Sequence, residues 1–223
     1  MNELLFLLHV FWVSLVAFLC RKQSVTVQTV LMTVYALLGN LMVLKQMTLF
    51  GLSVTTADVY AVGVILVLNY IRESSTDEKV HQAMLYSFGS LVLLALAAYF
   101  QISYVAIEGD QMSEAYFQLM AHFPKIVVVS AVVYLVVQYI DNKLFSWMKR
   151  ISNNRWFIGR VLLSLVFSQL LDTVLFSLGA LGDIAVSIWD IIIFSSLIKI
   201  ICSALMVVNS AFTHKAYKLI INR

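Results

Sequence analysis

The sequence has few residues that break helices or crosslink a chain. Its 223 residues include one proline, eight glycines and two cysteines. Cys20 and Cys202 lie at the end of or within apolar runs, without the spacing of metal ligands, so they indicate neither a metal site nor a disulfide. Pro124 stands where an apolar run begins, a position that helix starts favour. Transporters with broken helices usually interrupt paired spans with glycine or proline, so this chain predicts continuous helices and a site built from side chains.

Charged residues are also scarce, at 12%, whereas 61% of the residues are hydrophobic. Soluble proteins average about 25% charged and about 45–50% apolar residues. A soluble core of this size could not bury so much apolar surface, so we predict one integral membrane domain over residues 1–223. The chain lacks the motifs G-x-x-x-x-G-K-[ST], G-x-S-x-G and H-E-x-x-H, which argues against a P-loop and against the commonest serine and zinc hydrolases. We therefore predict no enzyme, cofactor, metal or nucleic-acid partner.

The apolar runs predict an all-α fold, because about 20 mostly apolar residues form a helix that crosses the bilayer. Seven such runs cover residues 3–20, 24–44, 52–71, 80–104, 125–145, 158–180 and 186–208. The third is the least regular because Asp58 lies in its first turn, where Thr55-x-x-Asp58 fits a capping box. Between the fourth and fifth runs, residues 113–120 predict a short interfacial helix capped by Ser113.

The basic residues predict the orientation, since Lys and Arg gather in cytoplasmic segments. With the N-terminus outside and the C-terminus inside, all but three of the fifteen Lys and Arg residues fall in inner segments. Lys45 and Lys125 fall outside, and Lys199 lies within the last run. The alternation favours a multi-pass protein of the cell membrane.

Two ionisable residues lie near the middle of the last two runs, Asp172 and Lys199. A charge at mid-bilayer costs about 2.5–3.5 kcal/mol on insertion, which makes such residues functional candidates. A short loop joins the two runs, so antiparallel packing would bring both residues to one depth, where an ion pair lowers both costs. The alternative is a pair that only fixes helix register. Gln169 and Phe176 share the helix face of Asp172 and complete this candidate site.

A similar pattern occurs in the fifth run. Gln138-x-x-Asp141-x-x-x-Phe145 repeats the spacing of Gln169, Asp172 and Phe176, either as a duplicated element or by chance. Asp141 lies near the inner end beside Lys143, so an ordinary interfacial pair fits it equally well. Asn40 in the second run is another candidate, because we expect no local bond to account for it.

Taken together, these segments resemble the queuosine precursor transporter family. The matching elements are Asn40-Leu-Met-Val-Leu-Lys45-Gln-Met-Thr-Leu-Phe-Gly51, Leu68-Asn69-x-x-x-Glu73, Pro124-Lys125-Ile126, Ser130, Gln138-x-x-Asp141, Ser168-Gln169-x-x-Asp172-Thr173-x-x-Phe176 and Lys199. Two departures are Ser74-Ser75-Thr76, where the family often has an aromatic pair and a glycine, and Pro-Lys in place of Pro-Arg.

The resemblance implies uptake of a purine-like, 7-deazaguanine-type base for salvage into a modified tRNA nucleoside. The residues suit such a ligand, because a carboxylate accepts two adjacent N–H donors while a glutamine amide donates to a carbonyl. Alternatives from other classes are a substrate-binding subunit of an ATPase-energised uptake complex and a membrane-embedded enzyme. The sequence leaves open the base, the coupling ion (proton or sodium), self-association into a homo-oligomer and the aromatic residue that stacks on the ligand.

Overall fold

The computed structural model describes residues 2–151 and 157–201, although the side chains of Glu73, Gln138 and Asp141 are among those outside the description. The described elements are α1 (Asn2–Cys20), α2 (Val25–Met42), β1 (Gln46–Leu49), β2 (Leu52–Thr55), α3 (Ala57–Ser74), α4 (Asp77–Ser103), α5 (Ser113–Met120), α6 (Phe123–Ile151), α7 (Phe157–Leu181) and a last helical segment over residues 188–201.

The fold is mostly helical, as the sequence predicts, and each of the seven apolar runs contains a helix. Within the described residues, four helices are long and apolar enough to cross a membrane: Asn2–Cys20, Val25–Met42, Asp77–Ser103 and Ser113–Val137. Val166–Leu181 forms a shorter apolar helix. The number seven and the orientation of the chain stay predictions.

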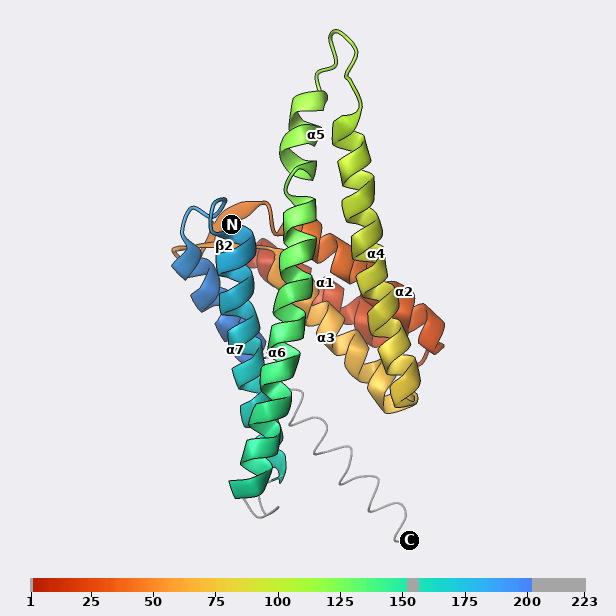
Figure 1. Ribbon diagram of the computed structural model, residues 1–223, viewed down its shortest axis with the longest axis vertical. Helices are drawn as coiled ribbons and strands as arrows, with labels where there is room; N and C mark the ends of the chain where they lie inside the picture. The colour runs from red at the N-terminus through yellow and green to blue at the C-terminus, as the bar shows by residue number, and fades with distance from the viewer. Residues whose placement is uncertain (1, 152–156, 202–223) are drawn as a thin grey trace.

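The helices form two groups that α4 joins (Figure 1). Helix α3 packs against α1 and α2, α6 packs against α7, and α4 contacts both α2 and α6. The N-terminus, the β1–β2 hairpin and the loop over residues 182–187 lie together, well away from the α3–α4 turn at the lower end (Figure 1).

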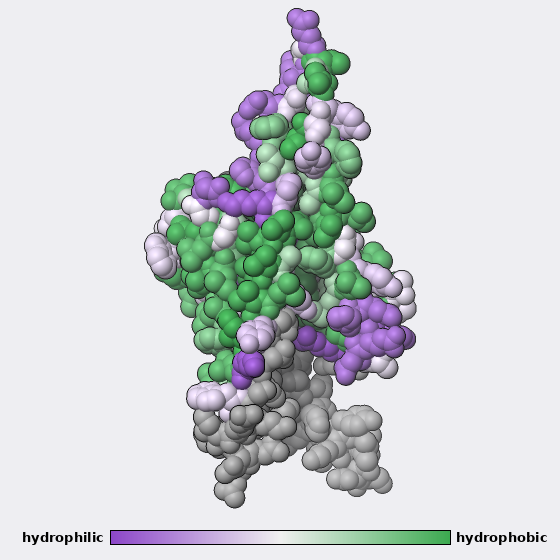
Figure 2. All heavy atoms as spheres, viewed as in Figure 1, coloured by the Kyte–Doolittle hydropathy of each residue, from purple (hydrophilic) through white to green (hydrophobic). Residues whose placement is uncertain are grey.

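The surface has the polarity expected of a membrane protein. Figure 2 shows a broad hydrophobic area along the middle of the molecule, with hydrophilic residues at the tip between α4 and α5 and around the α3–α4 turn. Many large apolar side chains of α1 and α4 are exposed, among them Leu4, Phe11 and Leu93. Because hydrocarbon is as apolar as these side chains, such exposure is favourable in a bilayer and costly in water.

Gln28 closes the turn between α1 and α2. Its side-chain amide donates to the backbone carbonyls of Cys20, Arg21 and Gln23 at 3.4, 2.9 and 3.1 Å. Two of these carbonyls lie just after the end of α1, so this fully buried amide holds the turn that leads into α2.

Gly63 marks the closest packing of the first three helices. A Cβ at this position would lie 2.7 Å from the Tyr35 ring and 2.8 Å from a Val13 methyl group. Only glycine allows α3 to come so near to α1 and α2, as small residues do at helix interfaces in membranes.

The β1–β2 hairpin was not expected from the sequence. Phe50 and Gly51 both have positive φ, at 50° and 81°, which suits a two-residue hairpin turn. Leu49 and Val54 are fully buried and anchor the hairpin in the core around α3. Residues 52–55 therefore belong to a strand, and the helix of the third run begins only at Ala57.

Two predicted helix caps are wrong. Thr56 is the N-cap of α3, with no side-chain bond to the helix, and Asp58 points to another helix instead of closing a capping box. The short helix at 113–120 is confirmed, but its N-cap is Met112, and Ser113 is its first residue.

Candidate functional site

The predicted ion pair between Asp172 and Lys199 is confirmed. The Lys199 ammonium donates to Asp172 Oδ2 at 2.9 Å, which joins α7 to the helix over residues 188–201. The Lys199 side chain is only 13% exposed, whereas that of Asp172 is 39% exposed. The lysine is thus enclosed by protein, while the carboxylate keeps part of its surface open.

A second carboxylate, Asp58, joins this pair. The Ser195 hydroxyl bonds to Asp58 Oδ2 at 2.7 Å, and both residues are buried, at 7% and 6% exposure. Ser195 lies one helical turn before Lys199, so the two share a helix face. The charge of Lys199 also acts on the Asp58 carboxylate. We call Asp58, Asp172, Ser195 and Lys199 the charged cluster.

Sequence reasoning missed Asp58 and Ser195 as members of this site. Asp58 was assigned to a helix start because Thr55 precedes it by three residues, a local pattern that many helices share. The signal that could have found both was the placement of polar residues in apolar runs. Ser195 stands one turn before the only lysine of the last run, and Asp58 is an acid within an apolar run.

Gln169 and Phe176 lie on the same helix as Asp172, as predicted. Gln169 is half-buried one turn before Asp172, and its backbone carbonyl accepts a bond from the Thr173 hydroxyl at 2.8 Å. The Phe176 side chain packs against an apolar cluster that contains Ile126 and Ile191. The ring of Phe176 thus takes part in helix packing, and Gln169 lies one turn before Asp172 on the same helix.

Of the other candidates, only Asn40 has a described side chain, and it bonds within its own helix. Asn40 donates to the backbone carbonyl of Ala36 at 2.8 Å, so the expectation that no local bond accounts for it is wrong. Such a bond from a side chain to the carbonyl one turn earlier on its own helix accounts for the polar group locally. The side chains of Gln138 and Asp141 lie outside the description, and their role stays a prediction.

The comparison with protein families identifies the chain. Residues 55–212 match the model of a family described as "Putative vitamin uptake transporter". The chain belongs to this family. All four members of the charged cluster fall within the matched residues. No curated protein and no solved structure matches the chain.

Membership in this uptake transporter family makes the chain a membrane transporter. The charged cluster agrees with that role, because ionisable residues inside membrane helices commonly mark substrate and ion pathways. The family match specifies no substrate more closely than a vitamin.

The hairpin is bonded to the segment that leads into the last helix. The Gln46 side chain donates to the Ile184 carbonyl at 2.9 Å and accepts from the Val186 amide at 2.8 Å. Asp190 accepts from the Ser53 amide at 2.9 Å. These bonds fix the start of α3, which carries Asp58, against the start of the helix that carries Ser195 and Lys199.

A salt bridge near the same end joins α6 to the loop after α7. The Lys125 ammonium pairs with the Asp183 carboxylate on the surface. The bond from Lys125 lowers the pKa of Asp183 below its ordinary value, helped by a backbone hydrogen bond. In this chain the lysine after Pro124 therefore contacts an acidic loop residue.

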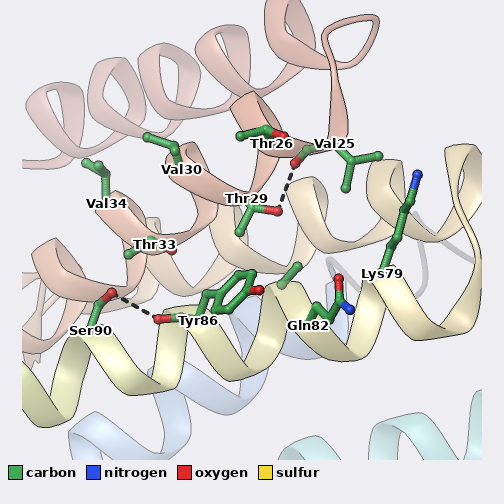
Figure 3. A pocket seen from close by; sticks show the side chains of 11 residues that line it. Val25, Thr26, Thr29, Val30, Thr33, Val34, Lys79, Gln82, Tyr86 and Ser90 are labelled. Carbon is green, nitrogen blue, oxygen red and sulfur yellow. Dashed lines mark hydrogen bonds between the residues drawn. The ribbon is translucent and has the colours of Figure 1, made fainter.

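A separate groove of about 460 Å³ lies between α2 and α4 (Figure 3). Thr29, Val30 and Thr33 of α2 line it opposite Lys79, Gln82 and Tyr86 of α4. Thr29 bonds to the Val25 carbonyl of its own helix, whereas Thr33 bonds across to Ser87 of α4 at 2.9 Å. None of the predicted site residues whose side chains are described lines this groove.

No group of three or more His, Cys, Asp or Glu side chains that could hold a metal ion occurs in residues 2–151 and 157–201 as far as they are described.

Proposed function

We propose that this transporter imports 7-deazaguanine-type bases, the precursors of queuosine, for salvage into tRNA. The observation that carries the proposal is the Asp172–Lys199 pair with Gln169 one turn away. Lys199 occupies one oxygen of the carboxylate, and 39% of the Asp172 side chain is still exposed. With one oxygen bonded to Lys199, the carboxylate has lone pairs left for a ligand.

A guanine-like edge presents two adjacent N–H donors and one carbonyl acceptor. The Asp172 carboxylate accepts from the donors in charge-assisted bonds, and the Gln169 amide donates to the carbonyl. Lys199 holds the carboxylate in place, because a carboxylate fixed by a second bond loses less freedom when the ligand binds. In this arrangement Lys199 positions the Asp172 carboxylate, and Gln169 sets the orientation of the base.

Asp172→Asn tests this arrangement. The change replaces one carboxylate oxygen by an N–H donor that faces a donor of the base, and sites built on buried polar pairing reject such mismatches by factors of about 10⁴. Gln169→Leu removes one neutral bond worth about 0.5–1.5 kcal/mol, so affinity should fall by about 2- to 12-fold.

The experiment is equilibrium binding of a labelled 7-deazaguanine to purified protein in detergent, with thermal unfolding to show that each variant is folded. Asp183→Asn is a matched control, since it also neutralises an aspartate that pairs with a lysine, but on the surface. Wild-type affinity in a folded Asp172→Asn protein would remove α7 from the site. Retained ATPase subunits during purification would point to a binding subunit, and chemical conversion of the base would point to an enzyme.

A further inference from the structure

The charged cluster contains two carboxylates and one ammonium group. Lys199 bonds to Asp172, which leaves Asp58 with the Ser195 hydroxyl as its hydrogen-bond partner in the described residues. Asp58 is the more deeply buried of the two acids, at 6% exposure. One buried negative charge is thus in excess when both aspartates are ionised, and a buried unpaired charge is strongly unfavourable.

No other described titratable group compensates Asp58. The neighbouring helices α1 and α2 contribute His9 and Tyr35, but His9 bonds to the Tyr60 hydroxyl, and the Tyr35 hydroxyl donates to the Val13 carbonyl. On the last helix, Asp190 bonds to the Ser53 amide. Lys199 is therefore the charge that acts on Asp58, and it is already engaged by Asp172 of α7.

We propose that Asp58 is the proton site of this transporter, and that its protonation couples uptake to a proton gradient. The inference rests on the proposed function only in taking Asp172 as the ligand carboxylate. A proton neutralises the excess charge, and the Ser195 hydroxyl suits either state, because it donates to a carboxylate and accepts from a carboxylic acid.

A proton fits this place better than a sodium ion. Hard metal cations need a shell of several oxygen ligands, as calcium and magnesium sites show. Asp58 has one hydroxyl beside it, and the Lys199 charge acts on the same place. The ammonium group opposes any added positive charge, but a proton needs no ligand shell beyond the carboxylate and its hydroxyl partner.

The position of Lys199 links the two carboxylates. Ser195, the partner of Asp58, lies one turn before Lys199, so a change of side-chain rotamer can carry the ammonium from Asp172 towards Asp58. When Asp58 is protonated, Lys199 has one ionised acid to pair with and keeps Asp172 ready for the base. When Asp58 loses its proton, the two acids compete for Lys199, and the ligand carboxylate loses its support.

Proton and base therefore bind cooperatively, and by linkage each raises the affinity for the other. The affinity for the base is therefore high at a pH where Asp58 is protonated, and it falls as the pH rises and Asp58 loses its proton. A carrier that binds both together moves the base inward when protons flow inward. One coupled proton supports up to about tenfold accumulation per unit of pH difference.

The test uses proteoliposomes that contain the full chain, loaded or unloaded with a 7-deazaguanine. Wild-type protein should accumulate the labelled base when the outside is acidic. Asp58→Asn, which imitates the protonated acid, should stop at equal concentrations inside and outside. Asp183→Asn, on the surface, should accumulate the base like wild type. Accumulation by Asp58→Asn driven by the pH difference would overturn the proposal.

A second measurement does not depend on the substrate. Infrared spectra of the purified protein should show a protonated carboxyl band at neutral pH that is absent from Asp58→Asn and present in Asp183→Asn. If the wild-type protein lacks that band, Asp58 is ionised, and its assignment as the proton site is wrong. If the base neither binds to the protein nor enters the liposomes, the proposed function is wrong. The infrared spectra would still show whether Asp58 carries a proton.

Discussion

The Asp172–Lys199 pair gives the sharpest energetic prediction. Asp172→Asn leaves Lys199, which is 13% exposed, without its hydrogen-bonded acid, and Lys199→Met leaves Asp172 without its cation. Removing one partner of a buried pair costs about 3–5 kcal/mol, whereas exposed pairs contribute about 0–1 kcal/mol. Asp172 is 39% exposed, so this pair falls between the two limits.

We therefore expect each single substitution to lower the free energy of unfolding by about 1–3 kcal/mol. The double variant should cost about 1–2 kcal/mol less than the sum, because it removes both charges together. Asp172→Asn should cost less than Lys199→Met, since Asp58 can replace Asp172 as the partner of Lys199. Adding Asp58→Asn to Asp172→Asn should remove that substitute and increase the loss.

The assay is reversible unfolding in mixed detergent micelles, followed by circular dichroism, for wild type, the two single variants and the double variant. Similar slopes of the transitions show that the four proteins unfold the same structure. Strictly additive losses would mean that the two side chains do not interact, which would refute the ion pair as the organising contact of the site.

Three further predictions concern the fold. Gly63→Ala should destabilise the protein by about 1–3 kcal/mol, because the new Cβ would clash with Tyr35 and Val13. Gly89→Ala, with open space around it, should be neutral or stabilising. Equal effects of the two substitutions in thermal unfolding would contradict the close packing at Gly63. The pKa of Asp183 is lowered, so its pair with Lys125 stabilises the protein above about pH 4, and this stabilisation is lost as the pH falls through the lowered pKa. Lys125→Met should therefore unfold at a lower temperature than wild type at pH 7 and at the same temperature at strongly acidic pH. A cysteine at Asp110 in a cysteine-free chain should react with an impermeant reagent in intact cells; reaction only after permeabilisation would reverse the orientation.

The positions of the helices could be predicted because the bilayer fixes the length and polarity of a span. The seven apolar runs all contain helices, and the boundaries differ by a few residues. The β1–β2 hairpin could not be predicted this way. Residues 52–55 are apolar enough to extend the third run, and the turn at Phe50 and Gly51 lacks the usual Asn-Gly or Asp-Gly signal.

The site was predictable only in part, for a related reason. Asp172 and Lys199 are expensive in a membrane and belong to consecutive helices, so pairing them needs no knowledge of distant contacts. Asp58 bonds to Ser195, 137 positions away, and a single sequence gives no direct sign of such a contact. The local pattern with Thr55 suggested a cap instead. For Asn40 the error was the opposite one: it was predicted as a site residue, but a bond to its own helix satisfies its amide.

The most direct test of the central claim is uptake of a labelled 7-deazaguanine into proteoliposomes that contain this chain alone. The wild-type protein should take up the base in saturable fashion and without ATP, and excess unlabelled 7-deazaguanine should block the uptake. Folded Asp172→Asn protein should take up no more than empty liposomes, and Asp183→Asn should match the wild type. Uptake by Asp172→Asn at the wild-type rate, or none by the wild type itself, would contradict import of this base through the charged cluster.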